Sequence, residues 1–555
     1  IMEEVLKIRD TAQPVIHCEW FDLFKSGAAI NQLENHILPA YLKRMRWFGG
    51  KSRPFPSVVI YQNIPIAAGS DFVHYLLLKV RYPDFPTEIY ALPVNFVPAR
   101  QFQDIPSEAV IARLENSVSP GYITDALFDE AFQTALYLMV KQEKYLNEGH
   151  HYPVSTHAGK LLLDDSEKMI HSRLLHADQS NSAIIYNERL FLKFFRKLEY
   201  EKNPDLELTR FLTEQGLFRQ IPAYAGSIEI HHPEKPAMLA VLLQQLVPNE
   251  GNAWDWFLNR INLFYSESGG TNTLGKPFPA RPAKHQITWE ETPEILKKLI
   301  GEEVFQMAYR LGCRTAELHR ALGNEKILPA FKPERANREK QHAYAQALTL
   351  LIDQKTELLQ RNLLKIPDAY QQGASELIAA REDIKAFVNK TVAQQEQGML
   401  IRTHGDYHLG QVLIAKDDLF ILDFEGEPDK PHIQRIQKNS PLKDVPGMMR
   451  SFRYVAYASL MSQDKSGPEA REQLLPLADL WYHFVSRYFL GAYLECIKDS
   501  GLIPQGADFN AYLQLQSIEK TVYELGYEIN NRPEWTIIPL LSLIKFVRFY
   551  LHPQV

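Results

Sequence analysis

The fold is decided by His404-Gly405-Asp406-Tyr407-His408-Leu409-Gly410-Gln411 and, shortly after it, Ile421-Leu422-Asp423-Phe424-Glu425-Gly426-Glu427-Pro428. An apolar run leads into Asp406, the amide of Gln411 follows five residues later, and Asp423 ends a second apolar run. This layout is typical of a kinase-type phosphotransfer site, in which one Asp faces the acceptor hydroxyl while the amide and the second Asp hold magnesium. The tripeptide His404-Gly405-Asp406 alone is more simply a turn at a strand end, so the prediction rests on the combined spacing.

Magnesium prefers oxygen ligands in octahedral geometry. We therefore expect Asp406 to orient the acceptor hydroxyl and take its proton, and Gln411 and Asp423 to ligate Mg²⁺. Glu425, two residues after Asp423, is expected to reach the metal or its waters.

Composition sets the class of protein. The 555 residues suggest three or four domains, or fewer large ones, and 45% hydrophobic with 23% charged residues are globular values. The net charge of −6, without a long basic block, argues against nucleic acid or an anionic membrane as the main partner. The three cysteines are far apart and odd in number, which argues against a disulfide framework or a zinc site and favours a cytoplasmic location. The apolar run at 540–551 is interrupted by Lys545 and Arg548 and predicts no membrane span.

Three regions differ in their patterns. Residues 1–110 begin with helical periodicity at 30–47, followed by strand-like runs at 58–61, 73–80 and 89–94. Residues 111–247 are mixed, with strands expected at 174–177, 183–186, 190–195 and 238–243, and a helix after the N-cap Asn203 and Pro204. Residues 248–555 are mainly helical, with amphipathic stretches at 304–322, 341–360, 374–390, 447–460, 474–498 and 509–527. A Gly, Ser, Thr and Pro-rich segment at 266–285 reads as an exposed loop. A small β-rich lobe followed by a helical lobe is the α+β bilobal plan in which ATP binds between the lobes.

Lys193 lies within the apolar strand 190–195 and needs a partner if it is buried. Phosphate oxygens and Glu207 on the next helix would form the Lys–Glu arrangement of kinases, with Glu201 and Glu199 as rival partners. An edge-strand Lys that points to water is the simpler alternative.

Two segments are candidates for nucleotide binding. The turn that contains Ser180 and Asn181 lies where kinases place a glycine-rich phosphate cover, and it has no Gly, so binding and a plain turn are equally compatible with it. The segment from Gln245 to Val247 follows an apolar strand and is either the hinge whose backbone bonds the adenine or a plain linker, or both.

A third candidate is the helix face of Lys520, Tyr523, Glu524 and Tyr527, spaced i, i+3, i+4 and i+7. Tyr rings pack on sugar faces while charged groups bond hydroxyls, so this face suits a polyhydroxylated ligand. A solvated face with a surface Glu–Lys pair is the alternative.

In several of its motifs the chain resembles the maltokinases. The motifs that carry the resemblance are 404–412, 423–428 and 440–454, together with 46–51, 203–207, 311–319 and 523–535. The similarity runs from about residue 20 to the end. It implies a eukaryotic-protein-kinase-like, aminoglycoside-phosphotransferase-like fold with an N-terminal cap subdomain at 1–110, an N-lobe at 111–247 and a helical C-lobe at 248–555.

The resemblance also implies the reaction. ATP and Mg²⁺ would phosphorylate maltose at the anomeric hydroxyl to give maltose 1-phosphate for α-glucan and glycogen synthesis from trehalose. The Lys520, Tyr523, Glu524 and Tyr527 face would bind the sugar, with His408 close by. Such kinases often follow a trehalose synthase in one polypeptide, which would account for a chain that starts at Ile1, as a numbering choice or tag would equally.

Extra sequence near 260–290 and 325–375 departs from the pattern, and we expect it to touch no catalytic group. Two alternatives stay open. One is a kinase for another sugar or aminosugar such as glucosamine, whose amino group would demand an extra carboxylate. The other is a silent kinase-like domain that organises a fused trehalose synthase, against which the presence of Lys193, Asp406, Gln411 and Asp423 argues.

Overall fold

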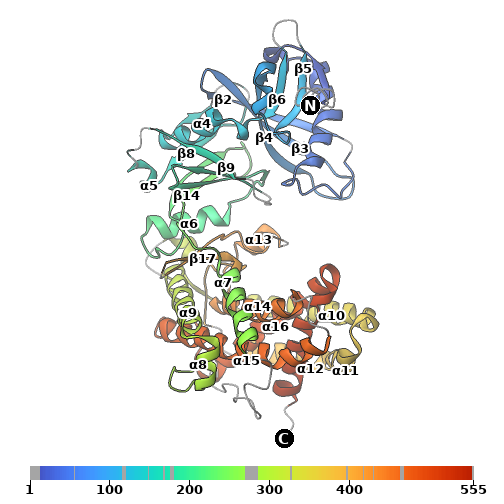
Figure 1. Cartoon of the computed structure of the whole chain (residues 1–555), viewed down its shortest axis with the longest axis vertical. Coiled ribbons are helices and arrows are strands. Elements are labelled where there is room, and N and C mark those ends of the chain that lie inside the picture. Colours follow the sequence, from blue (N-terminus) through green and yellow to red (C-terminus); the bar gives the residue numbers. More distant parts are fainter. Residues whose placement is uncertain are drawn as a thin grey trace. The chain divides into compact units, whose positions relative to one another are not determined.

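The computed structural model describes residues 13–552, except for 56, 116–119, 148, 150, 165, 167–168, 176–180, 269–285, 325–327, 395–397, 417, 429 and 463–467. The chain divides into two units (Figure 1). Unit 1 comprises Ile1–Gln215 and Pro222–Val247, and unit 2 comprises Gly216–Ile221 and Pro248–Val555.

Unit 1 begins with a sheet whose described strands run in the order β1-β5-β6-β4-β3-β2, with β12 also paired to β4. The strands are β1 (Val15–His17), β2 (Val58–Ala68), β3 (Asp71–Val80), β4 (Glu88–Pro98), β5 (Val110–Glu115), β6 (Gly121–Asp125) and β12 (Lys197–Leu198). The expected strands at 58–61, 73–80 and 89–94 are thus confirmed as parts of β2, β3 and β4. The pair β1–β5 is parallel and the others are antiparallel.

A helical segment packs its apolar stripe on this sheet. It consists of α2 (Gly27–Gln32), a π-helical turn (Leu33–Ile37) and α3 (Leu38–Arg44). The stripe includes Leu33, Tyr41 and Leu42, which share one core with Leu78 and Leu92 of the sheet. The helical periodicity expected at 30–47 therefore holds, and the helix itself ends at Arg44.

The second sheet of unit 1 is antiparallel and has the order β7-β8-β13-β14-β11-β10-β9 among the described strands. The strands are β7 (Tyr145–Leu146), β8 (Val154–Ala158), β9 (Ser172–Leu175), β10 (Ser182–Tyr186), β11 (Leu190–Phe194), β13 (Tyr224–Ile230) and β14 (Met238–Gln245). Helices α4 (Glu130–Lys141), α5 (Lys160–Leu163) and α6 (Pro204–Glu214) accompany it. The expected cap is confirmed, because Asn203 accepts a hydrogen bond from the Leu206 N–H and Pro204 opens α6.

A buried ion pair joins segments of both sheets within unit 1. The Arg196 guanidinium donates to Asp125 Oδ2 at 2.6 Å and to Ser182 Oγ at 2.9 Å. It also lies 4.6 Å from the ring centre of Trp47. Arg196 and Asp125 are 2% and 1% exposed, so this pair is fully withdrawn from water.

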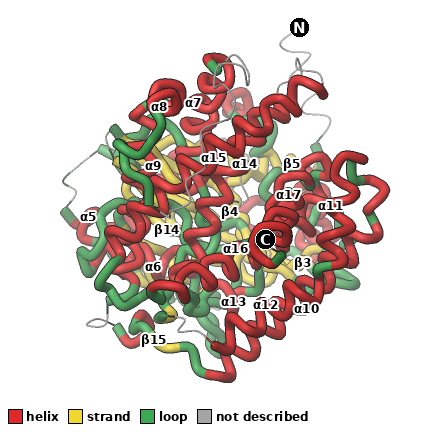
Figure 2. The backbone as a smooth tube through the Cα atoms, turned by 90° about the horizontal axis from the view of Figure 1, so that it is seen from below, coloured by secondary structure: helices red, strands yellow, loops and turns green. Residues whose placement is uncertain are grey.

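Unit 2 is mainly helical, as the sequence predicts (Figure 2). Its longer helices are α7 (Ala253–Glu267), α8 (Glu294–Ile300), α9 (Glu302–Leu322), α10 (Arg338–Arg361), α11 (Asp368–Ala379), α12 (Arg381–Gln394), α14 (Asp444–Ser462), α15 (Pro468–Ile497), α16 (Gly506–Asn531) and α17 (Ile537–Phe546). The amphipathic stretch 374–390 is divided between α11 and α12, which meet at Ala380, and α7 extends to Glu267, into the segment expected to be a loop. Most of that segment lies outside the described residues.

Helices α9 and α15 make a close approach at Gly312. A Cβ atom there would lie 2.2 Å from the Phe489 carbonyl oxygen, so only Gly fits. The same two helices are joined by a disulfide between Cys313 and Cys496, while Cys18 is free. The sequence argument against disulfides is therefore wrong for this pair, because helix packing brings together two cysteines that are 183 residues apart.

The remaining elements of unit 2 carry the motif with which the sequence analysis began. They include the antiparallel pair of β15 (Glu334–Arg335) with β16 (Met399–Leu400), the hairpin of β17 (Val412–Ala415) with β18 (Asp418–Ile421), and the helical turn α13 (His432–Arg435). Asp406 precedes β17 and Asp423 follows β18, so the hairpin returns the chain to the same end. Among the described residues, no helix combines the length and apolar character that crossing a membrane requires.

Candidate functional site

The loop that carries Asp406 is held by a buried carboxylate. Asp444, the first residue of α14, accepts hydrogen bonds from the backbone N–H of His404 at 2.9 Å and of Gly405 at 3.0 Å. Its Oδ2 also lies 3.1 Å from His319 Nε2 of α9. Burial opposes ionisation of Asp444, yet His319 and the loop amide keep its pKa below the usual value. An ionised carboxylate therefore fixes the backbone immediately before Asp406.

The second Asp of the motif is tied to the same loop. Gln411 donates its amide N–H to Asp423 Oδ2 at 3.1 Å, and the His404 ring nitrogen Nε2 lies 2.8 Å from the Leu422 carbonyl oxygen. Asp423 has a φ of 59°, a left-handed conformation that is strained for a residue with a Cβ. The structure thus brings together Gln411 and Asp423, the two expected magnesium ligands.

Asp406 lies beside a cation from α16 and an imidazole from its own loop. Lys520 Nζ is 3.8 Å from Asp406 Oδ1, and His408 Nε2 is 3.9 Å from Asp406 Oδ2. Burial lowers the pKa of His408, an effect that Asp406 opposes and Lys520 reinforces. His408 Nδ1 accepts the Gly410 N–H at 3.1 Å, so Nε2 carries the proton of the neutral ring on the side of Asp406.

Lys520 also pairs with Glu427, a residue to which the sequence analysis gave no role. Lys520 Nζ lies 2.8 Å from Glu427 Oε1, and Lys430 contacts the other carboxylate oxygen. Although burial acts against it, these two lysines lower the pKa of Glu427 to about 2. Burial likewise opposes the charge on Lys520, but Glu427 and Asp406 raise its pKa. Lys520 is therefore a fixed ammonium between two carboxylates.

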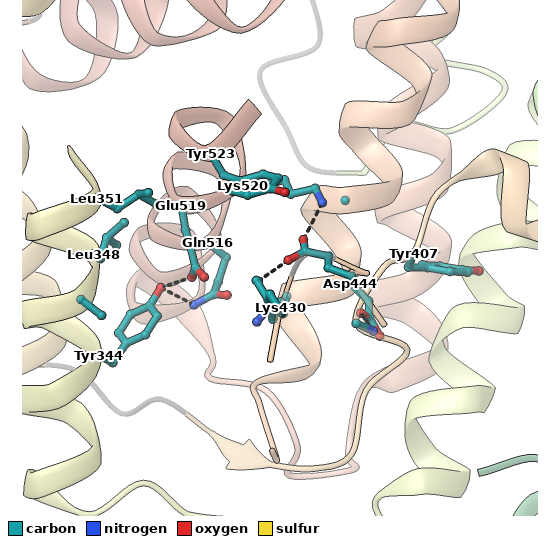
Figure 3. Close-up of a pocket in the computed structure, with 15 residues that line it drawn as sticks. Tyr344, Leu348, Leu351, Tyr407, Lys430, Asp444, Gln516, Glu519, Lys520 and Tyr523 are labelled. Atoms are coloured by element: carbon teal, nitrogen blue, oxygen red, sulfur yellow. Dashed lines mark hydrogen bonds and ion pairs between the residues drawn. The ribbon is translucent and has the colours of Figure 1, made fainter. Parts of the chain in front are cut away.

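A cavity of about 230 Å³ opens beside this cluster (Figure 3). Several parts of unit 2 line the cavity. The Asp406 loop and α14 contribute Gly405, Tyr407, Asp444 and Gly447, and the segment between them contributes Glu427, Lys430 and Lys443. Helix α16 contributes Gln516, Glu519, Lys520 and Tyr523, and α10 contributes Tyr344, Ala347, Leu348 and Leu351. Helix α10 belongs to the extra sequence at 325–375. That insertion therefore lies next to the residues expected to bind sugar, which the sequence analysis did not foresee.

Only part of the expected sugar face of α16 lines the cavity. Lys520 and Tyr523 line the cavity, but Glu524 pairs with the buried Arg450 of α14 at 2.7 Å. Tyr527 is 41% exposed, and the centre of its ring lies 5.5 Å from the Arg532 guanidinium carbon. Neither Glu524 nor Tyr527 lines the cavity, because α16 turns those residues toward α14 and toward the surface.

The nucleotide candidates lie in unit 1. Lys193 is half-buried on β11, inside the sheet rather than at its edge, and its Nζ is 3.4 Å from Asp205 Oδ2. Asp205, in the first turn of α6, thus lies beside Lys193, and the expected pairing of Lys193 with Glu207 stays a prediction. Helix α6 starts at Pro204, which places Asp205 in its buried first turn.

The two backbone candidates fare differently. The Gln245 N–H donates to the Ala223 carbonyl at 2.8 Å, so this N–H is used within unit 1, and the hinge role of 245–247 stays a prediction. Val247 is buried two residues later. Asn181 is half-buried just before β10, and Ser180 lies outside the described residues.

Four buried residues that hold the site together were not predicted from the sequence. Asp444, His319, Glu427 and Arg450 are all buried polar groups. A usable signal existed for Asp444, since an Asp at the start of a long apolar helix is a common N-terminal residue. Its bonds to a loop 40 residues earlier carry no local signal.

Comparison with known proteins places these findings in context. Residues 41–129 match the maltokinase N-terminal cap domain family. The glucosamine kinase of Streptacidiphilus jiangxiensis is 23% identical over 368 residues, which cover 66% of this chain and 71% of that protein. The glucosamine kinase of Mycolicibacterium smegmatis is 23% identical over 372 residues, covering 67% of this chain and 78% of that protein.

Solved structures of glucosamine kinase share the fold. One, in complex with glucosamine, ADP and inorganic phosphate, superposes with a TM-score of 0.59 over 92% of this chain and 99% of that chain, at 17% identity. A second crystal form gives 0.59 at 18% identity, over 90% and 95% of the two chains. The expected α+β kinase-like fold, with an N-terminal cap and a helical C-terminal part, is confirmed.

Proposed function

We propose that this protein is an ATP-dependent sugar kinase. The observation that carries the proposal is the position of Asp406, on a loop fixed by Asp444 and beside the ammonium of Lys520. The similarity to glucosamine kinases and to the maltokinase cap supports the same class. A catalytic carboxylate held this firmly suits phosphoryl transfer, which needs positioning more than covalent chemistry.

Each residue then has a role. Asp406 accepts the proton of the acceptor hydroxyl and orients its oxygen for attack, while Lys520 holds the carboxylate from one side. His408 is neutral and offers its Nε2 proton to a second hydroxyl of the same acceptor. In unit 1, Lys193 is the residue for nucleotide phosphate oxygens, with Asp205 as its partner.

The side chains also fit a magnesium ion. Gln411 and Asp423 already lie 3.1 Å apart, and a turn of the Gln411 amide would present an oxygen beside a carboxylate. Oxygen donors of this kind are those that Mg²⁺ prefers. When bound, the ion would neutralise phosphate charge, and Glu425, two residues after Asp423, would hold it or its waters.

Maltose is the acceptor that we propose first, with maltose 1-phosphate as the product and α-glucan synthesis from trehalose as its use. The match of residues 41–129 to the maltokinase cap supports it, as does the placement of Lys520 and Tyr523 on the cavity wall. Polyhydroxylated ligands suit such a mixture of cation, carboxylate and ring.

Glucosamine is the second candidate, and specific observations favour it. The two relatives described above, which match about two thirds of this chain, are glucosamine kinases. An aminosugar demands a carboxylate, and Glu519 lines the cavity near the lysines.

A panel of maltose, glucosamine, glucose and trehalose with ATP and Mg²⁺ decides between them. Phosphorylation of maltose, with the phosphate placed on the anomeric carbon by ³¹P NMR, supports the first proposal. Activity on glucosamine alone replaces maltose with the second candidate. If the wild-type protein phosphorylates no sugar, a silent kinase-like domain is the correct description.

A further inference from the structure

Helix α10 presents one continuous face to the cavity. Tyr344, Ala347, Leu348 and Leu351 are spaced i, i+3, i+4 and i+7, and all four line it (Figure 3). Three of these side chains are apolar, whereas the segment between the loop and α14 contributes the charged groups Glu427, Lys430 and Lys443. A ligand that fits here has an apolar face and a polar edge, as a pyranose ring does.

The polar end of the cavity is pre-organised by a hydrogen-bond chain between α10 and α16. The Gln516 amide donates to the Tyr344 hydroxyl at 2.9 Å, and that hydroxyl donates to Glu519 Oε2 at 2.7 Å (Figure 3). Burial raises the pKa of Tyr344 well above its usual value, so the phenol remains a donor. Glu519 is therefore held with one oxygen occupied and the other available as an acceptor.

Lys443 supplies a donor at the same end. Within the part of the chain that the structure describes, its ammonium has no hydrogen bond or ion pair, although Glu519 and Glu427 act on it electrostatically. Burial lowers the pKa of Lys443, because a withdrawn ammonium lacks the hydration that stabilises its charge. A ligand hydroxyl that accepts from Lys443 would replace that hydration.

We propose that α10 forms the wall of the acceptor site and that Glu519 and Lys443 bind the far edge of the acceptor ring. The inference rests on the proposed function. The ring presents one hydroxyl to Asp406 and extends into the cavity beside Lys520. Lys520 connects the two places, because it lies next to Asp406 and also lines the cavity.

The size of the cavity limits the acceptor. Its volume of about 230 Å³ lies below the roughly 300–1,000 Å³ of common ligand pockets. A cavity of this volume has room for about one sugar ring, and a second ring, as in maltose, would extend beyond it. Helix α10, as one wall of this cavity, thus helps to set which sugars fit.

The test uses the full chain and fills the cavity from α10. Ala347 lines the cavity but is exposed, so Ala347→Phe adds volume without removing core. Leu350→Phe on the exposed face of the same helix is the matched control. Calorimetry measures the binding of the accepted sugar, and steady-state kinetics measures KM for sugar and for ATP separately.

We expect Ala347→Phe to weaken sugar binding and raise its KM about tenfold or more, and Leu350→Phe to match the wild type. KM for ATP should stay within about twofold in both, because the change removes no nucleotide contact. Lys443→Met provides a second variant and should weaken sugar binding about tenfold through loss of a charged donor.

Unchanged sugar binding in folded Ala347→Phe and Lys443→Met would overturn the assignment of α10 while leaving the kinase proposal intact. A wild-type protein that phosphorylates none of the sugars would instead remove the proposed function. Glu519→Gln adds a distinction between acceptors, since loss of its charge should weaken glucosamine more than maltose. Equal losses for the two sugars would show that Glu519 does not face the amino group.

Discussion

Replacing Asp444 by Asn disturbs the site without changing any of the residues expected to react. The carboxylate accepts from His404 N–H, Gly405 N–H and the His319 ring, and it is 2% exposed. Asn keeps one acceptor oxygen and turns an NH₂ group toward a buried donor. Hydrogen bonds to a charged group contribute about 1.5–3 kcal/mol each, and breaking a buried pair costs about 3–5 kcal/mol.

We therefore expect Asp444→Asn to lower the free energy of unfolding by about 3–5 kcal/mol. Urea denaturation followed by circular dichroism measures it. The catalytic rate should fall at temperatures where the variant is still folded, because Gly405 precedes Asp406 and loses its anchor, while KM for sugar changes little.

Asp418→Asn is a suitable comparison because it also removes a bonded carboxylate. Asp418 pairs with Arg314 at 2.8 Å, but both side chains are partly exposed, so the loss should be about 1 kcal/mol or less. If Asp444→Asn is as stable as Asp418→Asn and retains the wild-type rate, the loop does not depend on Asp444 and the reasoning fails.

The pH dependence gives an independent check on the same residue. Since the folded-state pKa of Asp444 is lowered, its contribution to stability is complete above about pH 4 and is lost as the pH falls further. The Asn variant should lack this part of the acid dependence. Parallel acid unfolding curves for the two proteins would contradict the account.

Local patterns predicted much of the fold. The Asn203 cap, the strands β2, β3, β4 and β11, and the convergence of Gln411 with Asp423 all follow from alternation, turn residues and short spacing. Such features depend on residues close together in the chain, so local sequence patterns are enough to predict them.

The partners of buried charged groups could not be predicted in this way. Glu524 was expected to face a sugar but pairs with Arg450, 74 residues away. Tertiary packing decides which of several nearby carboxylates meets a cation, and the helical period fixes only the face. The position of α10 on the cavity wall could not be predicted for the same reason, since its apolar face would pack equally well against any core.

Three further predictions concern Arg196, Gly405 and Glu427. Arg196→Met should leave Asp125 buried without its partner and destabilise the protein by about 3–5 kcal/mol in thermal or urea unfolding, and a loss below about 1 kcal/mol would show that the pair is solvated. Gly405→Ala should cost about 1–3 kcal/mol of stability and most of the activity, because a φ of 88° strains any residue with a Cβ; unchanged activity would mean that the loop tolerates another conformation. The Glu427 carboxylate, with its pKa lowered to about 2 from 4.5, should contribute about 3 kcal/mol that is present above pH 4.5 and lost toward pH 2, and Glu427→Gln should abolish this acid transition while the wild type retains it.

The proposed function depends on Asp406, which we expect to activate a sugar hydroxyl for phosphoryl transfer. The most direct measurement is the rate of sugar-dependent ADP release by the wild type and by Asp406→Asn, with calorimetric sugar binding for both. We expect the wild type to phosphorylate maltose or glucosamine, and Asp406→Asn to lose about 100-fold or more of that rate while it still binds the sugar. Turnover of the variant at the wild-type rate would contradict it.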